Sequence, residues 1–220
     1  HELSILSDFK LGRIKKVLPL MIATHEFTTI PQKKSAREIL NVSSDTLLFS
    51  FLGRYSQGKG INLLIHAFSK IISDYPDTRL LLVGRDDGAE SELRKLIDNK
   101  KLQSYVMMQP PLYESDRLTV YTAADFFITT PLVYEETATT TLESLICGTP
   151  VITTHQASIP YLKSCDGVIH IDASVSAITR ALRAVCELHT VGKTISVNSA
   201  LVIAYFDSDI VCAKVLGQYE

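Results

Sequence analysis

The sequence predicts an α/β fold, a doubly wound parallel sheet of the Rossmann-like type. From residue 47 onward, short apolar runs bounded by Gly or Pro alternate with longer segments of helical periodicity, the pattern of successive βαβ units. The chain has 220 residues, 46% of them apolar, which is enough to bury a sizeable core. Its 10 Gly and 8 Pro are far fewer than a low-complexity chain carries. These features indicate an ordinary globular domain.

Each expected strand is a short apolar run, rich in β-branched or aromatic residues, that ends at a turn residue or a helical segment. Six such runs follow one another at residues 47–52, 79–83, 105–108, 125–130, 151–154 and 168–171. Because helical segments separate them, we expect the six strands to lie in parallel. An earlier apolar run, residues 17–23, is too short to span a membrane, which takes about 20 residues, and is expected to be an additional strand.

Each expected helix shows apolar residues three or four positions apart. In residues 61–75 this stripe runs from Leu63 to Ile72, and Pro76 follows its end. Further helices are expected at residues 89–99, 114–123, 139–147 and 174–188, and residues 196–217 are expected to form two helical pieces with a break near 206–209. Residues 24–46 are expected to form a loop and one short helix, with Lys33, Lys34 and Arg37 on a solvated face.

Composition excludes several classes of protein. With 22 basic and 24 acidic side chains the net charge is -2, so no global field attracts nucleic acid or a membrane, and an anion site has to be built locally. The four cysteines form no C-x-x-C pair, which indicates buried, reduced thiols in a cytoplasmic protein. His66, His155 and His170 form no metal-binding pattern, so no metal site is expected.

The loop after the first expected strand has the chemistry of a phosphate site. Residues 53–60 supply Arg54 and Lys59, together with three glycines that let the backbone approach oxygen atoms closely. Gly53, Gly58 and Lys59 also match the P-loop spacing G-x-x-x-x-G-K-[ST], but Gly60 stands where that motif needs a hydroxyl for magnesium. The alternative interpretation is a simple strand-to-helix turn with two exposed bases.

A second loop, residues 131–143, follows the fourth expected strand. Its threonines can cap the next helix and leave the amides of residues 137–140, which include Thr139 and Thr140, available to an anion. Glu135 lies in the loop, and Glu143 lies beside the core stripe of the helix, where a partly buried carboxylate needs a partner such as vicinal ribose hydroxyls. The alternative for Glu143 is a solvated helix residue.

Taken in order, these features resemble the donor-binding half of the retaining GT-B glycosyltransferases, specifically family 4 (glycosyl transferases group 1). The resemblance covers residues 47–162, and the final helical segment also fits the family. It rests on Gly53-Arg54, Lys59-Gly60, the strand ending at Gly84, Ala124-Asp125, the Glu135 and Glu143 pair with seven residues between them, and the Cys-Gly-Thr-Pro-Val run at residues 147–151.

The resemblance implies a role for each motif residue. Arg54 and Lys59 would bind the diphosphate of a nucleotide sugar, Glu135 would contact the donor sugar, and Glu143 would hold the ribose. The base would pack near the strand that contains Met108. The implied donor-binding set is Gly53, Arg54, Lys59, Met108, Glu135, Thr139, Thr140 and Glu143, with Glu135, Arg54 and Lys59 as its catalytic members.

The resemblance also implies a domain organisation. Residues 1–30 would be the end of a missing N-terminal acceptor domain and its linker, and residues 31–220 the nucleotide-sugar-binding domain with closing C-terminal helices, the C-terminal half of a GT-B fold. The complete enzyme would move a hexose, without a metal, from a nucleotide-diphosphate sugar to a glycan or lipid-linked acceptor in polysaccharide biosynthesis. That enzyme would be cytoplasmic, with peripheral contact at the inner membrane surface as a further expectation.

The isolated chain is expected to bind donor without transferring sugar. Apolar surface near residues 1–23 and 200–220 is expected to favour self-association. After Glu135 the family commonly has an aromatic residue and Gly, whereas Glu136, Thr137 and Ala138 stand here, which predicts an unusual donor preference. Residues 157–161 also depart from the family pattern. Three alternatives remain open: a noncatalytic nucleotide-sugar-binding module, a nucleotide-sugar epimerase of the same fold, and a P-loop-like hydrolase.

Overall fold

A single parallel sheet forms the centre of the protein. The computed structural model describes residues 21–135, 137–157 and 165–216. Its six strands are all parallel and lie in the order β3-β2-β1-β4-β5-β6. They are β1 (Leu47–Leu52), β2 (Thr78–Val83), β3 (Val106–Gln109), β4 (Phe126–Thr129), β5 (Val151–Thr154) and β6 (Val168–Ile171). The doubly wound sheet predicted from the sequence is confirmed, each of these strands to within one residue.

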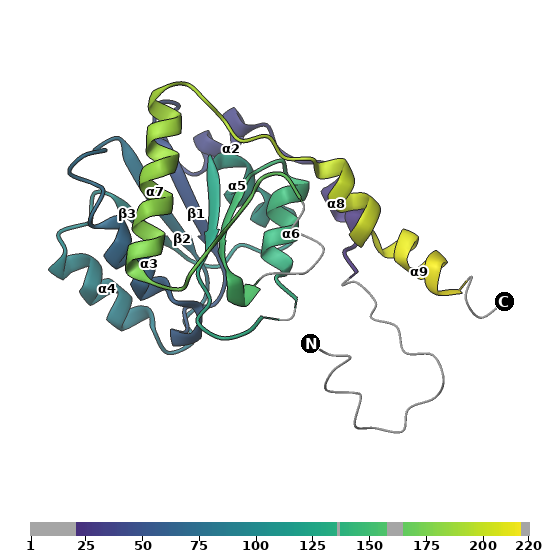
Figure 1. The fold of residues 1–220 in the computed structure, drawn as a ribbon, viewed down its shortest axis with the longest axis horizontal. Coiled ribbons are helices and arrows are strands. Elements are labelled where there is room, and N and C mark those ends of the chain that lie inside the picture. The colour runs from purple at the N-terminus through teal and green to yellow at the C-terminus, as the bar shows by residue number, and fades with distance from the viewer. Residues whose placement is uncertain (1–20, 136, 158–164, 217–220) are drawn as a thin grey trace.

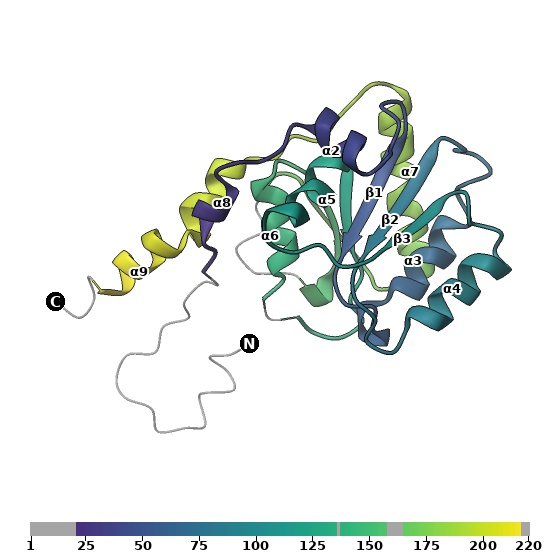
Figure 2. The ribbon, with the colours of Figure 1, turned by 180° about the vertical axis from the view of Figure 1, so that it is seen from behind.

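Helices cover both faces of the sheet (Figure 1). One face carries α3 (Ile61–Phe68), α4 (Glu90–Asn99) and α7 (Val175–Thr190), and the view from behind shows α2 (Lys33–Ile39), α5 (Leu118–Ala123) and α6 (Thr139–Ile146) on the other (Figure 2). Side chains along β1 point alternately to the two faces of the sheet and contribute to a core on each. Phe49 and Phe51 pack on the first face, and Leu48 packs on the second.

Two helices differ from their sequence-based bounds. The helix expected at 61–75 ends at Phe68. The next turns contain hydrogen bonds between residues three apart instead of four, from Lys70 N to Ala67 O (3.0 Å) and from Ile71 N to Phe68 O (3.1 Å). The segment 114–123 is divided into a 3-10 turn, η4 (Glu114–Arg117), and α5. The apolar stripe predicted which residues are buried but not where α-helical geometry ends.

The C-terminal segment has the predicted break. The helix α8 (Ser199–Phe206) stops at Asp207, whose carboxylate accepts the amides of Asp209 and Ile210 (both 3.0 Å) and so begins α9 (Ser208–Leu216). Both helices extend away from the sheet (Figure 1). They therefore form an arm on the side of α6.

The N-terminal segment lies along this arm instead of joining the sheet. Ile22 N donates to Phe206 O (2.7 Å) and Ser208 N donates to Ile22 O (2.9 Å), followed by a 3-10 turn, η2 (Thr24–Phe27). Residues 17–20 of the expected early strand lie outside the described residues. For its remaining residues the expected strand is wrong, because Ile22 makes only an isolated bridge to Asp207.

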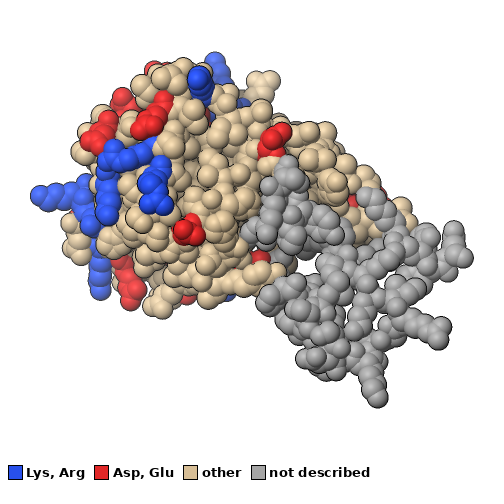
Figure 3. Space-filling view, in the orientation of Figure 1, with Lys and Arg blue, Asp and Glu red and all other residues tan. Residues whose placement is uncertain are grey.

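The arm leaves apolar side chains exposed. Met21 is 52% exposed, Tyr205 45% and Ile210 37%. Cys212 is exposed as well, so the expectation that all four thiols are buried is wrong. On the face drawn in Figure 3, Lys and Arg gather on the side away from the arm, and the surface toward α8 is largely uncharged. Across the described ranges, no helix combines the length and hydrophobicity required to cross a bilayer.

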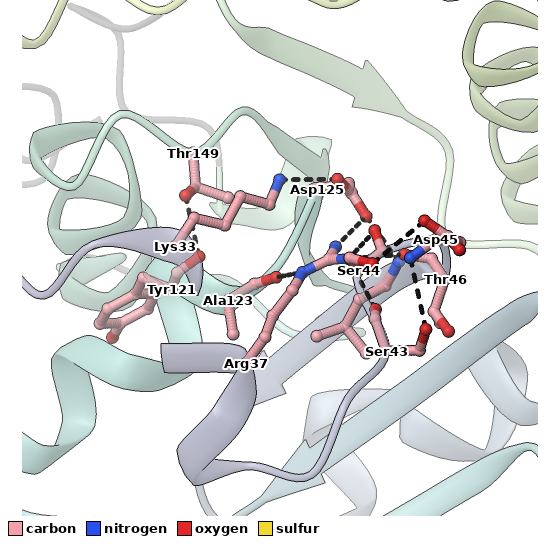
Figure 4. Close-up of polar contacts among 11 residues, drawn as sticks. Lys33, Arg37, Ser43, Ser44, Asp45, Thr46, Tyr121, Ala123, Asp125 and Thr149 are labelled. Atoms are coloured by element: carbon pink, nitrogen blue, oxygen red, sulfur yellow. Dashed lines mark hydrogen bonds and ion pairs between the residues drawn. The ribbon is translucent and has the colours of Figure 1, made fainter. Parts of the chain in front are cut away.

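Of the basic cluster of α2, Lys33 and Lys34 are exposed as expected from the sequence, but Arg37 is not on a solvated face. Arg37 is only 5% exposed and donates to the carbonyl of Ala123 (2.9 Å) and to Asp125 Oδ2 (2.7 Å). Its remaining bonds go to three carbonyls before β1, those of Ser43, Ser44 and Thr46. Figure 4 shows Lys33 and Arg37 converging on Asp125, which also accepts Leu48 N (2.7 Å). The Ala124-Asp125 motif therefore joins α2, β1 and β4 at the amino edge of the sheet.

Candidate functional site

The strand order places both loops singled out in the sequence at one point. β1 and β4 are neighbours, yet the chain leaves β1 toward β2 and leaves β4 toward β5, in opposite directions along the sheet. In doubly wound sheets, ligands bind in the crevice that such a reversal opens at the carboxyl ends of the strands. Residues 53–60 follow β1 and residues 130–138 follow β4. The two loops therefore flank the crevice.

Two glycines allow the loops to lie this close. A Cβ on Gly84, after β2, would lie 1.8 Å from the carbonyl oxygen of Gly53, so the loops after β1 and β2 touch through their backbones. Gly60 has a φ of 63°, and a Cβ there would lie 2.1 Å from the carbonyl oxygen of Thr130. The P-loop alternative needs Ser or Thr at position 60, and this packing disfavours it.

Lys59 and Glu135 come together across the crevice. The Lys59 ammonium forms an ion pair with the Glu135 carboxylate, and the two side chains are 24% and 17% exposed. The backbone supports this contact, because Leu132 N donates to Gly58 O (2.8 Å) and Glu135 N to Gln156 O (2.9 Å). Two of the three proposed catalytic residues are thus in contact.

The third proposed catalytic residue, Arg54, points to a different partner. Its Nη1 lies 2.6 Å from Asp87 Oδ2, in the turn after β2, and the two side chains are 55% and 41% exposed. An exposed pair of this kind contributes about 0–1 kcal/mol, so an anionic ligand can displace Asp87 at little cost. Arg54 and Lys59 both follow β1, but each holds its own carboxylate.

The start of α6 differs from the expected threonine cap. The N-cap residue is Ala138, with a φ of 35° and no side-chain hydrogen bond to the helix, so a threonine cap is wrong here. The first amides of a helix have no partner within it, and those of Thr139 and Thr140 occupy this position. They carry the partial positive charge that attracts anions.

Glu143 is buried and held by two donors. The residue is 9% exposed, so the alternative of a solvated helix glutamate is wrong. Its Oε2 accepts the Tyr121 hydroxyl (2.6 Å), and Arg117 Nε lies 3.3 Å from Oε1 and 3.4 Å from Oε2. The sequence predicted that this carboxylate needs a partner and offered ribose hydroxyls, but it did not identify the two donors that the protein itself supplies. Arg117 and Tyr121 are four residues apart in the segment 114–123 and therefore share one face of the expected helix. This spacing is the feature of the sequence that could have indicated a pair of donors.

Burial determines the protonation of the groups around Glu143. Burial, followed by the nearby Glu143 charge, raises the pKa of Tyr121 well above its ordinary value, so the hydroxyl keeps its proton and donates. The same two causes raise the pKa of Cys147 to about 12. The thiol is therefore neutral at pH 7 and no candidate nucleophile.

Other expected features lie beside the site or outside the described residues. Met108 is the next-to-last residue of β3 and packs against the core under α3 and α4. Its contact with a base stays a prediction. Glu136 and residues 158–161, where the sequence departs from the family, are outside the described residues.

The histidines keep their expected places, with His66 in α3, His155 after β5 and His170 in β6. His155 stacks on His170 with ring centroids 6.0 Å apart. In the described part of the chain, no three His, Cys, Asp or Glu side chains are placed to hold a metal ion. Metal independence stays a prediction.

Fold and site together define a doubly wound α/β domain with a charged crevice at its strand-order reversal. The family model of glycosyl transferases group 1 matches residues 32–189, so the chain belongs to that family. Alpha-monoglucosyldiacylglycerol synthase from Streptococcus pneumoniae is 31% identical over 152 residues, which are 67% of this chain and 34% of that protein. The chain thus spans about a third of the length of this relative.

Solved structures share the fold. Anabaena HepE in complex with UDP-glucose superposes with a TM-score of 0.78 at 20% identity, covering 93% of this chain and 57% of that one. The C-terminal domain of a group 1 family protein from Francisella tularensis superposes with a TM-score of 0.64 at 18% identity, covering 88% of this chain and 98% of that domain.

Proposed function

We propose that this chain is the nucleotide-sugar-binding domain of a retaining, metal-independent glycosyltransferase that moves a hexose to a glycan or lipid-linked acceptor. One observation carries the proposal: Lys59 and Glu135 meet at the crevice between β1 and β4. The loop that contains Glu135 leads directly into α6, which begins at Thr139 and carries Glu143 on its second turn. This set matches the parts of a nucleotide sugar, with cations and amides for phosphate and carboxylates for hydroxyl groups.

Each group has a role in this function. Lys59, Arg54 and the amides of Thr139 and Thr140 bind the diphosphate and stabilise its negative charge as it leaves, a role that a divalent metal fills in other enzymes. Glu135 contacts the sugar next to Lys59. Glu143 accepts the ribose hydroxyls. The acceptor approaches from a second domain, because transfer needs an acceptor aligned with the donor.

Calorimetry with UDP, GDP and ADP, each with and without a hexose attached, tests the binding role and identifies the base. Lys59→Met and Arg54→Met should each weaken binding of the preferred diphosphate about tenfold or more, since a charged hydrogen bond contributes about 1.5–3 kcal/mol. Arg94→Met is the matched control, because Arg94 forms a similarly exposed pair with Glu90 on α4. Normal binding by both loop variants would overturn the phosphate assignment.

The transfer role needs a separate measurement. The chain alone should show no appreciable sugar transfer, and transfer should appear when an N-terminal acceptor half is supplied. Donor conversion without any acceptor would instead support the epimerase alternative, and donor binding with no transfer in either case would support a noncatalytic module.

A further inference from the structure

Arg117 occupies a position between two carboxylates that the proposed function does not explain. Its Nη2 lies 2.6 Å from Glu26 Oε2, and its Nε faces both oxygens of Glu143 at 3.3 and 3.4 Å. The guanidinium also lies over the ring of Phe27, 5.6 Å from its centroid. The side chains of Arg117 and Glu143 are 16% and 12% exposed, so their contact is largely shielded from water, whereas Glu26 is 48% exposed.

The contacts fix the direction of the Glu143 carboxylate. Tyr121 binds Oε2 from α5, and Arg117 spans the two oxygens from η4, so both donors belong to the segment between β3 and β4. A carboxylate has about four acceptor positions, and these contacts leave capacity on Oε1. A carboxylate held in one orientation suits a pair of ribose hydroxyls.

Glu26 connects Arg117 to the arm of α8 and α9. It lies in η2, four residues after Ile22, which is hydrogen-bonded to both Phe206 and Ser208. The same turn holds Phe27, which is buried beside α6 and α8 in one apolar cluster. A displacement of the arm would therefore act on Glu26 and Phe27, and through them on Arg117.

We propose that Arg117 is a positioning residue that orients Glu143 toward the donor ribose and couples this orientation to the N-terminal segment through Glu26. The proposal rests on the proposed function, because it takes Glu143 as the ribose acceptor. Arg117 itself touches no donor atom in this assignment. Its effect on binding has to pass through Glu143.

A double-mutant cycle with UDP and 2′,3′-dideoxy-UDP tests the proposal on the full chain. Arg117→Met should weaken UDP about tenfold, and leave the dideoxy analogue, which lacks the ribose hydroxyls, within about twofold. In a Glu143→Ala background, Arg117→Met should cause no further loss. Arg117→Lys should restore only part of the affinity, because an ammonium cannot span both oxygens. Glu26→Gln should give a smaller loss of UDP affinity, again without effect on the analogue.

The outcomes separate this inference from the proposed function. Normal UDP affinity of the Glu143→Ala variant would overturn the assignment of Glu143 to the ribose, and the inference with it. Suppose instead that Glu143→Ala loses UDP affinity. If Arg117→Met then binds UDP normally, or binds UDP and the dideoxy analogue equally more weakly, only the positioning role is wrong. Arg94→Met, which removes an exposed guanidinium from α4, is the control for loss of one positive charge, and thermal melts of each variant detect simple unfolding.

Discussion

Lys59 and Glu135 are 76 positions apart in the sequence, yet their side chains form an ion pair at the carboxyl ends of β1 and β4. The two side chains are 24% and 17% exposed, so the pair is partly shielded from water. In the proposed function, the ammonium would bind phosphate and the carboxylate would bind a sugar hydroxyl, so a nucleotide sugar would have to separate the pair.

Replacing one partner should separate the two roles. Glu135→Gln is expected to weaken the preferred nucleotide-diphosphate hexose about tenfold, because the charged acceptor for the sugar is lost. Affinity for the corresponding nucleoside diphosphate should stay constant or rise, because Lys59 is released for phosphate. Calorimetry with both ligands measures the ratio. Glu92→Gln, an exposed residue of α4, is the control, and equal losses for both ligands in Glu135→Gln would contradict the division of roles.

Arg37 and Lys33 offer a matched pair of stability variants, because both bind Asp125. Arg37→Met should lower the free energy of unfolding by at least about 1–3 kcal/mol, since it leaves four carbonyls without their donor and removes one of the three donors of the partly buried Asp125 carboxylate. Lys33→Met should cost less than about 1 kcal/mol, because Lys33 is 48% exposed. Urea denaturation compares the two. Equal losses would show that Arg37 acts only as a surface charge.

Gly84 is expected to tolerate no side chain. Gly84→Ala should destabilise the fold, because its Cβ would overlap the backbone oxygen of Gly53 at 1.8 Å and force the first two loops apart. Gly58→Ala is the control, since its Cβ would meet only Val133 Cγ2 at an ordinary 3.5 Å. Thermal melts should therefore show a clear fall for Gly84→Ala alone. Similar melting temperatures for both variants would contradict the close approach of the loops.

Asp86 should contribute to the pH dependence of stability. The amide of Glu90, followed by those of Gly88 and Ala89, holds the pKa of Asp86 below its ordinary value in the folded state. A lowered folded-state pKa means that the stabilisation is complete above the unfolded pKa and disappears as the pH falls through the folded one, below about pH 4.

Urea denaturation between pH 5 and about pH 2.5 measures this contribution. Asp86→Asn should be less stable than the natural chain at pH 5, and the difference should shrink as the pH falls. Asp98→Asn is the control: Asp98 lies near the end of α4, the helix that Asp86 precedes, and its carboxylate accepts the side chain of Gln103. A difference for Asp86→Asn that is constant over this range would contradict a role for its charge.

Much of the fold follows from local sequence. Apolar periodicity located the six strands of the sheet and the break near Asp207, because burial alternates with the period of each element. The glycines of residues 53–60 were expected to bring backbone close to phosphate oxygens, and that stays a prediction, whereas the close approach of Gly60 to Thr130 was not predicted. The spacing of Glu135 and Glu143 marked the second loop. These signals depend on residues near one another in the chain.

Tertiary structure alone determined what these segments touch. The neighbouring positions of β1 and β4 bring Lys59 to Glu135, and no local pattern encodes the order of strands in a sheet. Arg37 reads as a solvated cation in its own segment but is buried, because carbonyls that precede β1 and the carboxylate of Asp125 converge on it. Glu143 has its partners for the same reason: the packing of α5 on α6 places Arg117 and Tyr121 against a carboxylate more than 20 residues away in sequence.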